Sequence, residues 1–291
     1  MDVQIFLIQV LNSVQYGLLL FLVASGLTLI FGIMGVINLA HGSFYMIGAY
    51  LAYSLAPAFG GNFVLTLLAG LVLAVIFGYL LELLFVSYLY KRDHLQQVLM
   101  TYGLILVFEE LRSILVDNDV HGVPVPPWLA GSISLGDLMQ YPEYRLAISA
   151  VCLVVAAGMY FVIARTRLGM MIRAGNSNRE MAQSLGIDIK FLYRVVFAAG
   201  VALAVLAGMI AAPVSSVYPG MGAQVLIICF VVVVIGGIGS IWGALAAALL
   251  IGLADTFGKI LVPEVAGITV YLLMAAILLW RPEGLFKRVG G

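Results

Sequence analysis

The chain has 291 residues, of which 64% are hydrophobic and only 10% are charged, whereas soluble domains carry about 25% charged residues. Together with a mean hydropathy of +1.15, this composition excludes an ordinary soluble protein and indicates an integral membrane protein. The formal net charge is zero, which carries no information about partners, and no nucleic-acid partner is expected. Cys152 and Cys229 lie inside apolar runs, so neither a disulfide nor a metal site is predicted.

Charged residues are absent between Asp2 and Glu82 and between Arg194 and Asp255. At a rise of about 1.5 Å per residue, a single helix over the first interval would be about 120 Å long, against a hydrocarbon core of about 30 Å. The chain must therefore cross the bilayer repeatedly, and its uninterrupted apolar runs favour helices over the alternating strands of a β-barrel. We predict an all-α polytopic membrane protein with about nine transmembrane helices. The predicted spans are residues 5–32, 38–57, 63–90, 98–115, 146–164, 191–212, 225–235, 242–257 and 265–280.

These spans form one transmembrane domain over residues 1–291. Residues 1–116 make a first helical half and residues 191–291 a second. Between the halves we expect an external loop over 117–145, a linking helix over 146–164 and a polar loop over 165–190.

The basic residues predict the orientation of the chain. Of the 14 Lys and Arg residues, only Arg112, Arg145 and Lys259 fall on the side opposite to the 165–190 loop. Short cytoplasmic loops are enriched in basic residues, so this loop and the C-terminus are predicted to be cytoplasmic and the N-terminus to be outside. Fusing the short 225–235 segment with the next span would move the basic C-terminal residues outside, so two separate spans are preferred.

Two glycine-punctuated breaks occupy corresponding places in the halves: INLAHGSFYMIGA before the second span and VYPGMGAQVLIICF before the seventh. Five spans separate them, so the halves have opposite orientations and form an inverted repeat, in which paired breaks mark a translocation path. The candidate path residues are Asn38, His41, Gly42, Ser43, Tyr218, Gln224, Gly236, Gly237, Gly239 and Ser240. Two alternatives stay open: His41 could cap a helix start, and the glycines could serve close helix packing through Gly239 and Gly243.

The segment from Arg165 to Lys190 is the longest strongly polar run. Residues 176–178 are suitable N-caps, residues 179–185 can form two helical turns, and Gly186 is a natural residue to follow the helix end. Met181, Ala182 and Leu185 are predicted to share one face. Such a helix can insert into a groove on a soluble partner or lie on the membrane surface, and its own pattern leaves both readings open.

Ionisable groups inside membrane segments indicate function by default. Arg112 follows Glu109 by three residues and Lys259 follows Asp255 by four, so each pair can share a helix face. Pairing near the membrane interface is a simpler account of these residues than a proton relay. The external loop is acidic overall, and either meets a basic surface on a partner or forms a solvated lid; its acids are Asp117, Asp119, Asp137 and Glu143.

The polar loop also carries a resemblance. RAGNSNREMAQSLGI, with Ala182 and Gly186 four residues apart, is similar to the coupling loop of ABC importer permeases. Together with GLTLIFGIMGVINLAHGSFYMIGAY and VVVVIGGIGSIWGA, it resembles the LivH-type inner-membrane permeases for branched-chain amino acids, over residues 13–284. The resemblance implies a bacterial inner-membrane subunit, embedded in lipid, that forms half of the translocation path for leucine, isoleucine or valine. It also implies a second permease subunit of different sequence, two cytoplasmic ATPase subunits and a periplasmic binding protein as partners.

By the same resemblance, the residues that contact the ATPase are Asn178, Arg179, Met181, Ala182, Leu185 and Gly186. The chain contains no G-x-x-x-x-G-K-[ST] phosphate loop, so ATP and Mg²⁺ are expected on partner chains, and this chain is expected to be a transport subunit without cofactor rather than an enzyme. Because the spans hold little charge for a zwitterion, we expect a weakly binding path. Alternatives are a related importer for urea, amides or other amino acids, and an ion-coupled secondary transporter, which would need an unpaired carboxylate near mid-membrane.

Overall fold

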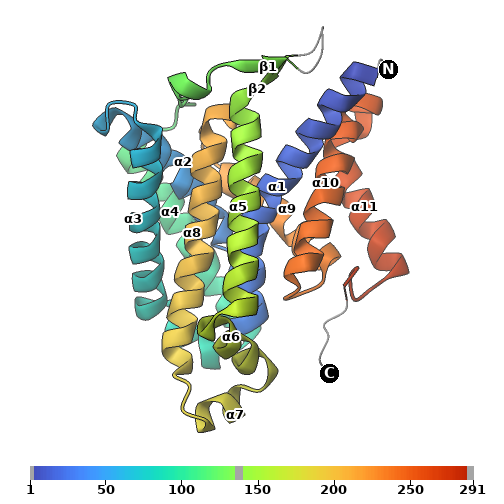
Figure 1. The fold of residues 1–291 in the computed structure, drawn as a ribbon. Coiled ribbons are helices and arrows are strands. Elements are labelled where there is room, and N and C mark those ends of the chain that lie inside the picture. The colour runs from blue at the N-terminus through green and yellow to red at the C-terminus, as the bar shows by residue number, and fades with distance from the viewer. Residues whose placement is uncertain (1–2, 135–139, 287–291) are drawn as a thin grey trace.

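A computed structural model describes residues 3–134 and 140–286, which form a helical bundle (Figure 1). The elements in chain order are α1 (Val3–Met34), α2 (His41–Ala58), α3 (Phe63–Leu84), the 3₁₀ helix η1 (Val86–Lys91), α4 (His94–Val116), η2 (Pro127–Leu129), β1 (Ser132–Ser134), β2 (Gln140–Pro142), α5 (Glu143–Arg165), α6 (Arg167–Ser177), α7 (Arg179–Ser184), α8 (Ile189–Ser215), α9 (Met221–Gly236), α10 (Ile241–Leu261), η3 (Pro263–Val265) and α11 (Ala266–Trp280). The two short strands pair antiparallel, with Ile133 opposite Tyr141. Asp137 of the predicted acidic loop lies outside the described residues.

Each of the nine predicted spans coincides with a helix of the described chain, namely α1 to α5 and α8 to α11. The all-α polytopic fold is therefore confirmed. Six helical segments of the described chain are long and apolar enough to cross a membrane, namely α1, α3, α5, α8, α10 and α11 together with η3, and α9 is a shorter apolar helix. The predicted third span was too long at its end, because the α-helix stops at Leu84 and continues as η1.

Side-chain caps fix where several helices begin. The carboxylate of Asp93 accepts from the Gln96 amide at 2.8 Å at the start of α4, and Asp188 does the same for Phe191 at 3.1 Å at the start of α8. Each cap satisfies one of the amides that the first helical turn leaves without a backbone partner. Both carboxylates precede helices that return from the end of the bundle where α7 lies.

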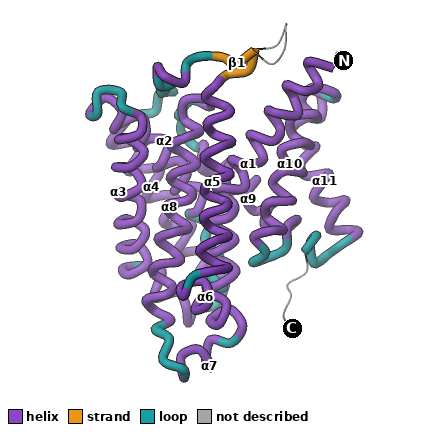
Figure 2. The backbone as a smooth tube through the Cα atoms, in the orientation of Figure 1, coloured by secondary structure: helices purple, strands orange, loops and turns teal. Residues whose placement is uncertain are grey.

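Burial separates inner helices from lipid-facing ones. The most apolar windows of α1 and α8 are 89% and 83% buried, whereas those of α5 and α11 are only 11% and 6% buried. Apolar side chains on the outer helices, such as Val154 and Leu279, are largely exposed. In a membrane protein such faces contact lipid, so α1 and α8 form the centre and α5 and α11 the periphery. Figure 2 shows the N-terminal end of α1 and the hairpin strand β1 at one end of the bundle, and α7 at the other.

The main packing partners of α1 and α3 lie in the second half of the chain. α1 of the first half lies along α10 of the second, and α3 of the first half lies along α8 of the second. Where equivalent helices cross, glycines meet: Gly26 of α1 against Gly200 of α8, and Gly42 of α2 against Gly222 of α9. A Cβ at Gly26 would lie 2.6 Å from the Gly200 carbonyl oxygen, and one at Gly200 would lie 3.0 Å from the Gly26 carbonyl oxygen. Glycine at these crossings lets the backbones of the two helices approach closely.

Candidate translocation path and coupling site

The first predicted break is present between α1 and α2, where residues 35–40 are not helical. His41 is the first residue of α2, is completely buried, and places Nε2 2.9 Å from the carbonyl oxygen of Val23 in α1. A carbonyl only accepts, so Nε2 donates. His41 therefore fastens α2 to α1 and does not cap its own helix, which corrects the alternative reading of this residue.

Polar atoms at this break remain without a partner in the described chain. The Asn38 side-chain oxygen accepts from the Ala40 amide at 3.1 Å, but the Asn38 Nδ2 atom has no hydrogen-bond partner, and neither has Nδ1 of His41. Buried polar groups are nearly always satisfied by protein or by water. Gly42 and Ser43 follow in the buried first turn of α2, and Gly42 is fully covered by Gly222. The first break is thus a buried, partly unsatisfied polar segment.

The second break, between α8 and α9, carries Tyr218 and Gln224. The Tyr218 hydroxyl donates to the Gln224 side-chain oxygen at 2.8 Å. The loop after α4 is held to this break, because His121 and Val217 exchange two backbone hydrogen bonds of 2.8 and 2.7 Å. Gly222, the second residue of α9, touches Gly42, so the structure brings the two predicted breaks together.

The predicted residues from Gly236 to Ser240 lie elsewhere, at the turn between α9 and α10. Gly236 packs directly on Gly243, a Cβ at Gly239 would lie 3.2 Å from the Cα of Gly32, and the Ser240 hydroxyl caps α10 by accepting from the Gly243 amide at 3.0 Å. Gly237 has a φ of +93°, which favours glycine. These contacts support the packing role. Only Gly239 and Ser240 also line a cavity, of about 900 Å³, between α5 and α10.

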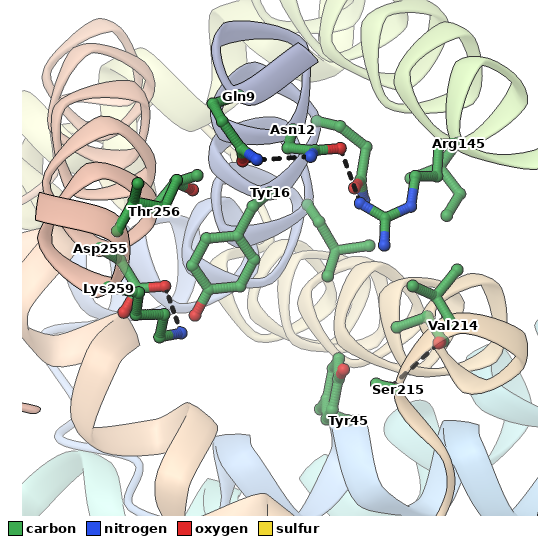
Figure 3. Close-up of a pocket in the computed structure, with 15 residues that line it drawn as sticks. Gln9, Asn12, Tyr16, Tyr45, Arg145, Val214, Ser215, Asp255, Thr256 and Lys259 are labelled. Carbon is green, nitrogen blue, oxygen red and sulfur yellow. Dashed lines mark hydrogen bonds and ion pairs between the residues drawn. The ribbon is translucent and has the colours of Figure 1, made fainter. Parts of the chain in front are cut away.

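A polar cavity that sequence reasoning missed lies at the end of the bundle that carries the N-terminus and the hairpin (Figure 3). Its volume is about 460 Å³, and α1, α2, α5, α8 and α10 all contribute to its walls. Three charged side chains line it: Arg145, Asp255 and Lys259. The spacing of Asp255 and Lys259 was visible in the sequence, but the approach of Arg145 from another helix was not.

The helix α7 has the predicted caps. The Asn178 side chain accepts from the Met181 amide at 2.9 Å, and Gly186 follows the helix with a φ of +87°. The Ile187 amide bonds to the Ala182 carbonyl at 3.1 Å and the Gly186 amide to the Gln183 carbonyl at 2.9 Å, which is a Schellman motif.

The predicted common face of α7 needs a correction. Ala182 is only 2% exposed and faces the protein, whereas Met181 and Leu185 are 58% and 76% exposed. Four-residue spacing places Met181 and Leu185 on one outward side, so they form the free apolar surface. α6, which the sequence reading did not predict, precedes α7 and begins with Thr166 as its cap, whose hydroxyl accepts from the Gly169 amide at 3.2 Å.

A chain of contacts links α7 to the inner bundle. The Arg179 guanidinium lies 4.9 Å from the ring centroid of Tyr193 and 5.9 Å from that of Tyr90. The Tyr90 hydroxyl donates to Glu82, whose side chain is 1% exposed and pairs with Arg194 at 3.3 Å. Burial, and then this hydrogen bond, raise the pKa of Tyr90 far above its usual value, so the phenol stays protonated and acts as the donor.

Helices that cross a membrane, paired breaks that meet inside the bundle and a capped polar helix at one end define a polytopic membrane transport protein. The family model described as the branched-chain amino acid transport system permease component matches residues 9–279, and the chain belongs to this family. It is therefore a multi-pass inner-membrane protein and a permease subunit of an ABC-type importer.

Named relatives align over nearly their whole length. The chain is 30% identical to the high-affinity branched-chain amino acid transport system permease protein BraD of Pseudomonas aeruginosa, over 97% of this chain and 96% of that protein. It is 27% identical to the permease protein LivH of Salmonella typhimurium, with the same coverage of both chains. A probable LivH of Methanocaldococcus jannaschii is 27% identical over 94% of this chain and 90% of that protein. No solved structure matches the chain significantly.

Proposed function

We propose that this chain forms half of the translocation path of an ATP-driven importer for leucine, isoleucine and valine, which a periplasmic binding protein delivers. The observation that carries the proposal is the family match over residues 9–279, together with relatives whose names specify branched-chain amino acid transport. A second permease subunit, of different sequence, completes the path. The meeting of the two breaks at Gly42 and Gly222 supports a path near these segments.

Two cytoplasmic ATPase subunits drive the cycle, with ATP and Mg²⁺ bound by those chains, and one of them docks on α7. Met181 and Leu185 supply the apolar contact, because both are exposed on a helix whose opposite side is held by Ala182. A displacement of α7 is transmitted to α3 and α8 through a series of side-chain contacts, which consists of Arg179, Tyr193, Tyr90 and Glu82. Docking of this kind inserts a short helix into a groove on the partner.

The N-terminus is outside and the C-terminus cytoplasmic in this proposal. The positive-inside distribution supports the assignment, since the basic residues near α6 and α7 would then face the cytoplasm. The acidic loop after α4 would face the periplasm, where the binding protein docks. Its fastening to the second break through His121 and Val217 offers a direct connection from docking to the path.

An ion-coupled mechanism is disfavoured because the buried carboxylate of the described spans, Glu82, pairs with Arg194 at 3.3 Å. Glu109 pairs with Arg112 at 3.4 Å, and Glu110 and Asp255 lie in the last two turns of their helices rather than near their middle. A secondary transporter needs a carboxylate that is free to exchange a proton or ion near mid-membrane.

The test is uptake of radiolabelled leucine into proteoliposomes that contain this chain with the permease, ATPase and binding protein encoded beside it. Uptake that requires enclosed ATP and persists with a protonophore is expected. Uptake driven by an ion gradient without ATP would refute the proposal, and uptake of urea or an amide in preference to leucine would refute its substrate.

A further inference from the structure

The outer cavity in Figure 3 differs from the other cavities in the chemistry of its walls. The cavity between α5 and α8 is lined by apolar side chains and glycine, and the one between α2 and α4 has Arg112 as its one charged side chain among the described residues. The outer cavity places groups of both charges around about 460 Å³. A volume of this size accommodates a small solute.

Arg145 forms one side of this cavity and is held in place. One terminal nitrogen of its guanidinium donates to the Asn12 side-chain oxygen at 2.7 Å. The same oxygen accepts from the hydroxyl of Tyr141 at 3.2 Å, and the Asn12 amide nitrogen donates to Gln9 at 3.3 Å. A guanidinium has five N–H donors, so Arg145, which lines the cavity, keeps donors that can bind a ligand.

Asp255 and Lys259 of α10 form the opposite side. Lys259 donates to one carboxylate oxygen of Asp255 at 2.6 Å, and its ammonium lies 5.9 Å from the ring centroid of Tyr16. The Asp255 side chain is 15% exposed and that of Lys259 is 60% exposed. An ion pair with such an exposed lysine contributes little and opens readily, so the carboxylate can accept a different cation.

We infer that this cavity binds the zwitterionic head group of a free amino acid, with Arg145 receiving its carboxylate and Asp255 its ammonium group. Guanidinium and carboxylate are the groups that form charge-assisted hydrogen bonds with these two ends of the ligand. Contacts across the cavity are direct or bridged by water. The inference rests on the proposed function for the identity of the ligand, and it replaces the expectation that the chain offers too little charge to hold a zwitterion.

The head group is the part that leucine, isoleucine and valine share, so this cavity would not choose among them. It would instead reject solutes that lack one of the two charges. Asn12 acts as a positioning residue for Arg145, because its side-chain oxygen accepts from the guanidinium.

The experiment uses the full chain in lipid nanodiscs, without the binding protein, so that the selectivity measured is that of the chain. Saturation-transfer NMR, which detects weakly bound ligands, compares leucine with leucinamide, which lacks the carboxylate, and with isocaproate, which lacks the ammonium group. We expect leucine to bind wild-type protein most strongly. Arg145→Gln should weaken leucine binding about tenfold and remove its advantage over leucinamide, since one charge-assisted interaction is lost.

The matching variant Asp255→Asn should remove the advantage of leucine over isocaproate, and Arg145→Lys should retain part of the preference for a carboxylate. Glu110→Gln, at an exposed position on α4 outside the cavity, is the control and should bind as wild type does. Circular dichroism verifies that each variant is folded. Equal binding of all three ligands to wild-type protein, or unchanged discrimination in both variants, would overturn the inference. The NMR measurement tests only the cavity, whereas the ATP-driven uptake of leucine tests the proposed function. A failure of one proposal can therefore be distinguished from a failure of the other.

Discussion

The guanidinium of Arg179 on α7 lies 4.9 Å from the ring centroid of Tyr193 on α8. Tyr193 is 2% exposed, so this contact joins a helix at the bundle's end to a side chain of its core. Because Arg179 itself is exposed, such a cation–π contact contributes about 0.5–1 kcal/mol. The contact nevertheless places a side chain of α7 directly against α8.

Arg179→Ala should leave the protein inserted and folded but lower the stimulation of ATPase activity by substrate in the assembled complex. The expected loss is severalfold, because the link between α7 and the inner helices is removed while the docking surface remains. Arg167→Ala, an exposed arginine on α6, is the matched control and should retain stimulation. Equal stimulation in both variants would show that Arg179 does not transmit the signal.

Gly186→Pro should abolish coupling because proline fixes φ near −65°, whereas Gly186 requires +87° to close α7. Gly186→Asn should be tolerated much better, since asparagine adopts the left-handed region more readily than most residues. Substrate-stimulated ATPase activity, measured with both variants at equal membrane expression, tests this. Ala182→Glu should also uncouple, since position 182 is buried; normal transport by this variant or by Gly186→Pro would remove the docking role of α7.

Gly26→Ala should destabilise the protein by about 1–3 kcal/mol, because its methyl group would overlap the carbonyl of Gly200 at the crossing of α1 and α8. Gly158→Ala is the matched control: it is also a helical glycine, but an added Cβ meets nothing within 4 Å, and alanine favours the helix. Thermal unfolding in detergent measures both. A similar melting temperature for the two variants would contradict close packing at this crossing.

The loop after α4 should loosen in acid. The Asp119 amide, followed by His121, lowers the pKa of Asp117 below its ordinary value of 3.8. A carboxylate whose folded pKa is depressed stabilises the fold fully above its unfolded pKa, and this contribution is lost as the pH falls through the folded pKa. Proteolysis of the loop with an acid-active protease should therefore accelerate below about pH 4.

Asp117→Asn is the control for that titration, since asparagine tolerates the positive φ of +78° at this position but cannot ionise. The variant should be cleaved faster than wild type at about pH 5, where the wild-type carboxylate is still ionised, and should show a smaller change on further acidification. If wild type and variant had the same pH profile, another group would be responsible for the loosening.

Local sequence signals predicted the parts of the molecule that local chemistry determines. The nine spans followed from hydropathy, the break before α2 from the glycine-punctuated segment INLAHGSFYMIGA, and the ends of α7 from Asn178 and Gly186. Each of these features depends on residues within a few positions of one another. α6 escaped notice because its residues are too polar to read as a span.

Features that depend on distant contacts could not be derived in this way. The pairing of Glu82 with Arg194 joins two halves of the chain, and the outer cavity takes its walls from five helices. Which side of α7 is covered depends on what packs against Ala182, so the sequence wrongly grouped it with Met181 and Leu185. The glycines near residue 239 had two readings, and the contacts with Gly32 and Gly243 that support the packing role could be found only in the structure.

The packing of α1 against α10 and of α3 against α8 has a consequence for the insertion of the protein into the membrane. The main packing partners of α1 and α3 are α10 and α8, and both are synthesised after the helix that they contact. At about 5–20 residues per second, a ribosome needs about 10–40 seconds to proceed from the end of α1 to the start of α10. During that interval the newly inserted helices are shielded by lipid or by the insertion machinery, and the contact of α1 with α10 can form only after α10 has entered the membrane.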